Sequence, residues 1–292
     1  MTLHGPVLVA LDLSSPSDEA LRQGSALARR LGAAVVAGHV LPEAYRVRVL
    51  FPQDSGIATD EQDAMAARAR VAVQARVDAL VTPGSVPVSV DVAAGTAHAG
   101  IVELADRVKA GVIVVGPGQT ALQVARAAHR PVLIARPSPA DGDILAATDF
   151  SDPALPAVRA GATEATRRGV ALRVIHCVEA DFTAALATAG LGGGLPVPPL
   201  PDPVVQQMEA QAHAQLLEAL ARCEVAGTPV VARASAASGI LQAAADPPAA
   251  LVTVGTRGRS GLARLMLGSV AEDVARRAPC SVLMVPLNPE RA

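Results

Sequence analysis

The chain contains two copies of one sequence pattern, and this duplication restricts its fold more than any other feature. The stretch from Leu8, "LVALDLSSPSDEALRQGSALARRLGAAVVAGHVLPE", aligns without a gap with "LAATDFSDPALPAVRAGATEATRRGVALRVIHCVEA" from Leu145. The alignment pairs Asp12 with Asp149, a shift of 137 positions (149 minus 12). A repeat this long exceeds the unit of a solenoid. We therefore expect a duplicated domain.

Two further matches locate the difference between the copies. "GTAHAGIVELADRVKAGVIVVG" aligns with "ASAASGILQAAADPPAALVTVG" at a shift of 139, and "VARAAHRPVLIARP" aligns with "VARRAPCSVLMVPL" at a shift of 150. The second copy therefore carries eleven additional residues (150 minus 139) between these matches, within "GTRGRSGLARLMLGS" at 255–269. The copies join near the Pro-rich polar stretch 136–143, which predicts domains at 1–139 and 140–292.

Each copy alternates strand-like and helix-like segments. Residues 6–13 form a short apolar run, typical of a strand buried on both faces. A helix follows, with a serine cap at its start and Gly32 at its end. We expect an α/β protein with two tandem Rossmann-like domains, each a five-stranded parallel sheet with helices on both faces. The Gly- and Pro-rich stretch 189–203 is predicted to be a surface loop.

Composition excludes several classes of protein. Aromatic residues make up 1% of the chain and the net charge is −2, which argues against nucleic-acid binding. We find no apolar run long enough to cross a membrane and no signal peptide, so we expect a cytoplasmic protein. Lys109 is the single lysine and does not lie in a Walker A loop. Cys177, Cys223 and Cys280 have no metal-binding spacing, which indicates reduced thiols and no metal site.

The eleven-residue insertion has the features of an anion-binding loop. Gly255 and Gly258 follow a buried strand and allow the backbone to approach a ligand closely. Gly268 and Ser269 then open a helix, whose free N–H groups and dipole favour an anion. Three arginines either add positive charge at the anion or belong to the solvated surface: Arg257, Arg259 and Arg264.

This pattern resembles the universal stress protein family in its tandem form, over nearly the whole chain. The resemblance rests on G-x2-G-x9-G-S from Gly255 to Ser269, on Asp149 after the first strand, and on His176 near the end of the second. It implies a site for ATP, or for ADP or AMP, with or without Mg²⁺. Asp149 would lie beside the ribose and the phosphates or their metal, and the backbone around Cys177 would meet adenine. The phosphates would be held by Gly255, Gly258, Gly268, Ser269 and Val270, with charge from Arg257.

The chain departs from the family pattern in two places. Ser281 stands where the final strand more often begins with proline, which the first copy keeps as Pro131. The first copy also retains Asp12 and His39, but its loop is reduced to "GPGQTALQ" at 116–123. We hypothesise that the first copy does not bind ATP and serves as a partner domain.

Alternative interpretations accompany these residues. The sequence 116–121 fits G-x-G-x-x-A, yet it follows the fourth strand of its copy and lacks the later acid of a dinucleotide fingerprint, so we interpret it as a shortened loop. Asp12 is interpreted as a helix-entry residue. Asp149 is interpreted either as a helix-entry residue or as a ligand contact. We interpret His39 and His176 as strand-end histidines with satisfied hydrogen bonds. The long glycine loop either binds a ligand or is a plain connection.

The resemblance implies an ATP-binding protein of stress tolerance or regulation. Glu272 and Asp273 are interpreted as first-turn acids of a helix, so no catalytic residue is assigned and any hydrolysis should be slow. The alternatives are a true ATPase or nucleotidyl-transfer enzyme, and a structural module without ligand. The final strands "PVLIAR" and "SVLMVP" are predicted to pair within one molecule as a pseudo-dimer, and a homodimer is a further option.

Overall fold

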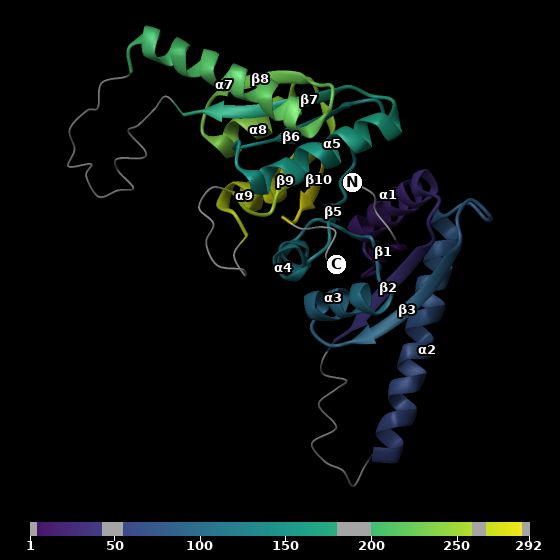
Figure 1. The fold of residues 1–292 in the computed structure, drawn as a ribbon. Helices are drawn as coiled ribbons and strands as arrows, with labels where there is room; N and C mark the ends of the chain where they lie inside the picture. The colour runs from purple at the N-terminus through teal and green to yellow at the C-terminus, as the bar shows by residue number, and fades with distance from the viewer. Residues whose placement is uncertain (1–4, 43–54, 180–199, 259–266, 288–292) are drawn as a thin grey trace, which may run out of the picture. The chain divides into compact units, whose positions relative to one another are not determined.

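The structure is a computed structural model that describes residues 5–42, 55–179, 200–258 and 267–287 (Figure 1). The chain forms two compact units. The first contains the chain up to Pro137 together with the segment from Ser281 onward, and the second contains the chain from Ser138 to Gly258 and from Gly268 to Cys280. The boundary expected after residue 139 stays a prediction.

Strands and helices alternate along both units. The first copy contains β1 (Val7–Ala10), α1 (Ser15–Leu31), β2 (Val35–Leu41), α2 (Ser55–Leu80), β3 (Val88–Ala94), α3 (Ala97–Arg107), β4 (Val112–Val115), α4 (Gln119–Ala127) and β5 (Val132–Ile134). The second copy contains β6 (Asp143–Ala147), the 3₁₀ turn η4 (Asp152–Ala154), α5 (Leu155–Arg168), β7 (Leu172–Val178), α7 (Asp202–Cys223), β8 (Thr228–Arg233), α8 (Ala236–Ala245), β9 (Ala249–Gly255), α9 (Ser269–Arg277) and β10 (Ser281–Val285). The predicted tandem α/β fold is confirmed. The loop expected at 189–203 lies outside the described residues up to 199, and α7 begins at Asp202.

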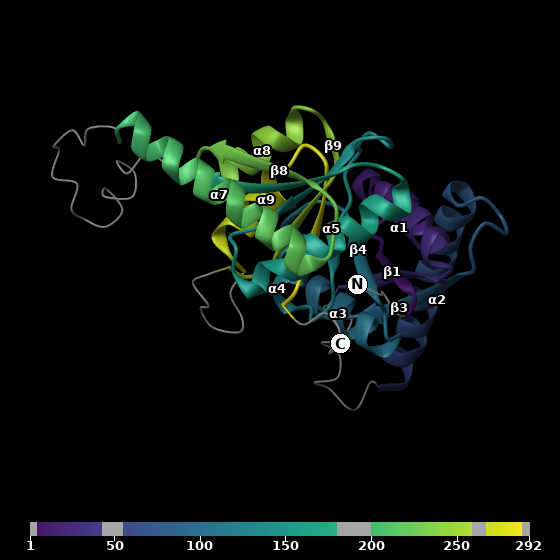
Figure 2. The same ribbon diagram turned by 45° about the horizontal axis from the view of Figure 1, so that its top comes forward.

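The two units share one strand order. The first has the parallel order β3-β2-β1-β4-β5, and the second has the parallel order β8-β7-β6-β9. Helices α1 and α2 pack on one face of the first sheet and α3 and α4 on the other, as the ribbon shows from two directions (Figures 1 and 2). The sheet interior is fully buried: Val7, Leu8 and Val9 have no exposed surface. This burial on both faces explains the continuous apolar run of each central strand.

The last strand of the chain completes the first unit. β10 pairs antiparallel with β5, with Leu283 opposite Leu133. The pairing of the two final strands expected from the sequence is therefore present. Ser281, at the start of β10, donates its hydroxyl to Gln23 Oε1 at 2.8 Å and accepts the backbone N–H of Arg136 at 3.0 Å. A proline at 281 would lack this hydroxyl. The serine that departs from the family pattern therefore adds hydrogen bonds at the start of the strand.

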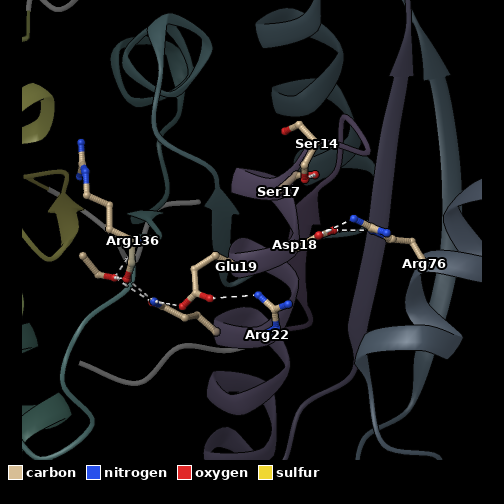
Figure 3. Close-up of polar contacts among 9 residues, drawn as sticks. Ser14, Ser17, Asp18, Glu19, Arg22, Arg76 and Arg136 are labelled. Atoms are coloured by element: carbon tan, nitrogen blue, oxygen red, sulfur yellow. Dashed lines mark hydrogen bonds and ion pairs between the residues drawn. The ribbon is translucent and has the colours of Figure 1, made fainter.

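Helix α1 is anchored by polar contacts as well as by its apolar face (Figure 3). Asp18 is buried, and its carboxylate forms a bidentate ion pair with the guanidinium of Arg76 in α2. Gln23 Nε2 donates to the carbonyl oxygen of Arg136 at 2.6 Å. Ser14 occupies the N-cap, but its hydroxyl bonds the Asp12 carboxylate and not a helix N–H. A serine therefore occupies the N-cap position, as predicted, but its side chain bonds the preceding loop and does not cap the helix.

In the described part of the chain, we find no helix that combines the length and the apolar character needed to cross a bilayer.

Candidate nucleotide site in the second unit

A cavity of about 350 Å³ opens in the second unit where β6, β7 and β9 end. The chain proceeds from β6 through β7 to β8 on one side, whereas β9 lies on the other side of β6. Loops diverge at such a switch point and leave a crevice at the carboxyl ends of the strands, where open α/β sheets bind their ligands. The volume lies within the usual range for small-molecule pockets.

The structure brings all eight site residues predicted from the sequence to this one cavity. The loop after β6 contributes one residue and β7 another, while the others come from the glycine loop and the start of α9. They are Asp149, Cys177, Gly255, Arg257, Gly258, Gly268, Ser269 and Val270. Arg259 and Arg264 lie outside the described residues. The role of each residue toward a ligand stays a prediction.

The Asp149 carboxylate is held by the loop that follows it. Its Oδ1 accepts the backbone N–H of Ser151 at 3.0 Å and also the Ser151 hydroxyl. Its Oδ2 lies on the side of Gly258, where an added Cβ would come within 2.7 Å of that oxygen. The carboxylate thus has one oxygen fixed to its own loop and the other facing the glycine loop.

The residue after Asp149 adopts an unusual backbone conformation. Phe150 has a φ of +67°, a left-handed value that bulky side chains rarely take and that costs on the order of 1–3 kcal/mol. Its ring packs on His176 with ring centroids 4.0 Å apart, and His176 Nδ1 donates to the Thr148 carbonyl oxygen at 2.9 Å. These contacts hold Asp149 at the cavity. They also confirm His176 as a strand-end histidine with a satisfied hydrogen bond.

Two glycines let the backbone of the glycine loop approach the loop after β6. A Cβ at Gly255 would lie 3.2 Å from the Pro153 carbonyl oxygen, and a Cβ at Gly258 would lie 2.7 Å from Asp149 Oδ2. Gly268 caps α9 with a φ of −61°, so it needs no left-handed conformation. The N-terminus of this helix, with the exposed Ser269, lines the cavity. Its N–H groups give the cavity an anion-binding end.

Part of the cavity wall is apolar. Cys177, Ala236 and Ile240 line it. A Cβ at Gly239 would lie 2.6 Å from Cys177 Sγ, so α8 carries a glycine where the sulfur needs space. Burial raises the pKa of the Cys177 thiol to about 11, so this part of the wall remains neutral at physiological pH. An uncharged aromatic ring fits such surroundings better than a charged group does.

Cys177 should resist alkylation at ordinary pH. With a pKa of about 11 the thiolate fraction at pH 8 is about one thousandth, against about one tenth at the ordinary thiol pKa of 9.0. Iodoacetamide labelling followed by peptide mapping should show a rate at Cys177 that rises until about pH 11, with Cys177→Ser as the blank. A midpoint near pH 9 in the folded protein would contradict this account.

Sequence reasoning missed several residues of this site. Ala236 and Ile240 correspond to Ala97 and Ile101 at the shift of 139, so the repeat itself carried a signal that these positions matter in both copies. Phe150 gave no signal, because its role depends on a left-handed backbone conformation that its residue type disfavours.

The acids of α9 form ion pairs along their own helix. Glu272 pairs with Arg276 at 2.7 Å and Asp273 pairs with Arg277 at 2.8 Å. Such i,i+4 pairs are typical of a solvated helix face. This arrangement agrees with the interpretation of both acids as helix residues.

Comparison with known proteins identifies the same pattern. The model of the Universal stress protein family matches residues 4–136 and again 142–286. A "Universal stress protein in QAH/OAS sulfhydrylase 3'region" from Thermus aquaticus is 32% identical over 151 residues, which is 49% of this chain and 96% of the relative.

Solved structures resemble the whole chain. A universal stress protein from Archaeoglobus fulgidus has a TM-score of 0.62 at 18% identity, covering 97% of this chain and 98% of its own. A putative universal stress protein from Pseudomonas aeruginosa has a TM-score of 0.62 at 17% identity, covering 98% of this chain and 94% of its own. At these identities the likeness concerns the fold.

Proposed function

This chain belongs to the universal stress protein family, as two family domains in tandem, and on that basis we propose that its second unit binds ATP. The observation that carries the proposal is the single cavity lined by all eight residues that the family pattern assigns to an adenine nucleotide. ADP and AMP are the close alternatives. The first unit, with its shortened loop, is proposed not to bind ATP and to serve as a partner domain.

Each group of residues that lines the cavity suits one part of a nucleotide. The neutral end beside Cys177 and Ile240 suits the base, and the Asp149 carboxylate suits the ribose hydroxyls or a Mg²⁺ ion carried on the phosphates. Arg257, the glycine loop and the start of α9 suit the phosphates, since they combine positive charge with close backbone approach. A bound Mg²⁺ would supply charge neutralisation at the phosphates.

The proposed role is regulatory. A ligand that binds only the folded chain stabilises it, and ATP is proposed to act in this way on stability and on partner affinity, including any homodimer. Hydrolysis is proposed to be slow, because no residue is assigned as a general base. The cytoplasm is the proposed location, where the three free thiols would stay reduced.

A thermal-shift series tests the proposal. ATP at one hundred times its Kd should stabilise the wild type by about 2.7 kcal/mol, whereas NADP should have a smaller effect. Gly268→Asp should lose the ATP shift, because it places a carboxylate where the phosphates would bind. Aspartate is itself a favoured N-cap, so this variant should keep its unfolding midpoint without nucleotide. If no adenine nucleotide shifts the wild type, the proposal is wrong.

A further inference from the structure

The first unit has a cavity of its own, of about 270 Å³, at the carboxyl ends of β1, β2 and β4. It lies at the switch point between β1 and β4, which corresponds to the one between β6 and β9. The shortened loop has therefore not closed the crevice. This site stands outside the proposed ATP site and has no role in it.

The apolar end of this cavity repeats that of the second unit. Val40, Ala97 and Ile101 line it, at the positions of Cys177, Ala236 and Ile240. The glycine contact recurs as well, because a Cβ at Gly100 would lie 2.6 Å from Val40 Cγ1. A slot for an uncharged ring is thus built in both units, and in the first unit its wall is fully aliphatic at these three positions.

The carboxylate beside the slot is also retained. Asp12 lines the cavity, and its Oδ1 accepts the backbone N–H of Ser14 at 3.0 Å together with the Ser14 hydroxyl. Leu13 has a φ of +65°, so the loop repeats the left-handed turn of Phe150. Burial raises the pKa of Asp12, but the hydrogen bonds from Ser14 and Ser17 outweigh this effect, and the pKa lies below its ordinary value. An ionised carboxylate is a strong acceptor for the hydroxyl groups of a ligand.

The remaining end differs from the second unit in charge. Gly116, Pro117 and Gly118 take the place of the long glycine loop, and Pro117 has no N–H to donate. Among the described residues that line this cavity, none is lysine or arginine, whereas Arg257 lines the other. The start of α4 also lines this cavity, and its N–H groups carry about half a positive charge. The ionised Asp12 carries a full negative charge, which no lysine or arginine among the described lining residues offsets, so the net charge still opposes an anion and each phosphate of a ligand adds to the repulsion.

We propose that the cavity of the first unit binds an uncharged ligand that joins a flat ring to vicinal hydroxyl groups, and that it discriminates against phosphorylated forms. A nucleoside has this chemistry, with its ring in the slot of Val40, Ala97 and Ile101 and its diol on Asp12. The choice of adenosine as the probe rests on the proposed function of the second unit. The chain would then hold two sites of opposite preference for charge.

Methyl NMR on the full chain separates the two sites, because the helix that lines each apolar slot carries an isoleucine there. Ile101 reports on the first cavity and Ile240 on the second, with assignments from Ile101→Val and Ile240→Val. Adenosine should shift the Ile101 signal in a saturable manner and bind there about tenfold or more tightly than ATP, with AMP between them. ATP should shift Ile240. Adenine and ribose, titrated alone, should each bind more weakly than adenosine at Ile101.

Matched aspartate variants complete the test. Asp12→Asn should weaken adenosine at Ile101 and leave the response of Ile240 to ATP unchanged, while Asp149→Asn should leave the response of Ile101 to adenosine unchanged. The inference is overturned if adenosine never shifts Ile101, or if ATP binds at Ile101 as tightly as adenosine. Failure of ATP to shift Ile240 would contradict the proposed function alone, since the Ile101 titration does not depend on it.

Discussion

Gly258→Val is expected to weaken ATP binding by a hundredfold or more, equivalent to about 2.7 kcal/mol. A Cβ at this position would lie 2.7 Å from Asp149 Oδ2, a separation that real Cβ atoms essentially never show. Either the glycine loop or the carboxylate must move, and both line the cavity. Isothermal titration with ATP measures the loss directly.

Gly169→Asn is the matched control for this change. Gly169 belongs to the same unit and ends α5 with a φ of +69°, with no atom within 4 Å of an added Cβ. Asparagine tolerates this conformation, so ATP affinity should stay at the wild-type value. Unchanged ATP affinity in Gly258→Val would show that the contact between the glycine loop and Asp149 does not shape the site.

Leu216→Ala is expected to destabilise the second unit by about 2–5 kcal/mol. Leu216 has no exposed surface, and α7 packs on α5, β7 and β8. Its neighbour Leu217 is 50% exposed, so Leu217→Ala should stay within about 0.5 kcal/mol of the wild type. Urea unfolding followed by circular dichroism compares the two variants, which have the same composition.

This pair also tests the orientation of α7. If Leu216→Ala and Leu217→Ala lowered the free energy of unfolding equally, the helix would not present Leu216 alone to the core. The sequence alone does not make this distinction, because α7 carries apolar residues on several sides and two adjacent leucines give no periodicity of their own.

Much of the fold followed from the internal repeat. Alternating strands and helices within each copy predicted a parallel sheet, and the growth in the alignment shift located the glycine loop. The site was predictable to the extent that its residues follow strand ends, because parallel strands bring such residues to one edge. Asp149 and Cys177, 28 positions apart (177 minus 149), meet at the cavity for this reason.

Other features depend on backbone geometry that residue types do not reveal. Phe150 and Leu13 adopt left-handed conformations against their own preference, and the packing of Phe150 on His176 follows from that turn. The hydroxyl of Ser14 bonds Asp12 although its position and type predict a helix cap. In each case a contact across the loop decides the conformation, and a local pattern contains no information about it.

The pairing of β10 with β5 has a consequence for the order in which the protein is made. A ribosome completes β5 about 150 residues before β10 (282 minus 134 is 148 for one pair of opposite residues), so the outer edge of β5 stays unpaired while those residues are made. Open edges recruit foreign strands. The nascent chain is therefore most exposed to misassembly between these two moments, because a strand that follows the second unit in the sequence completes the first unit.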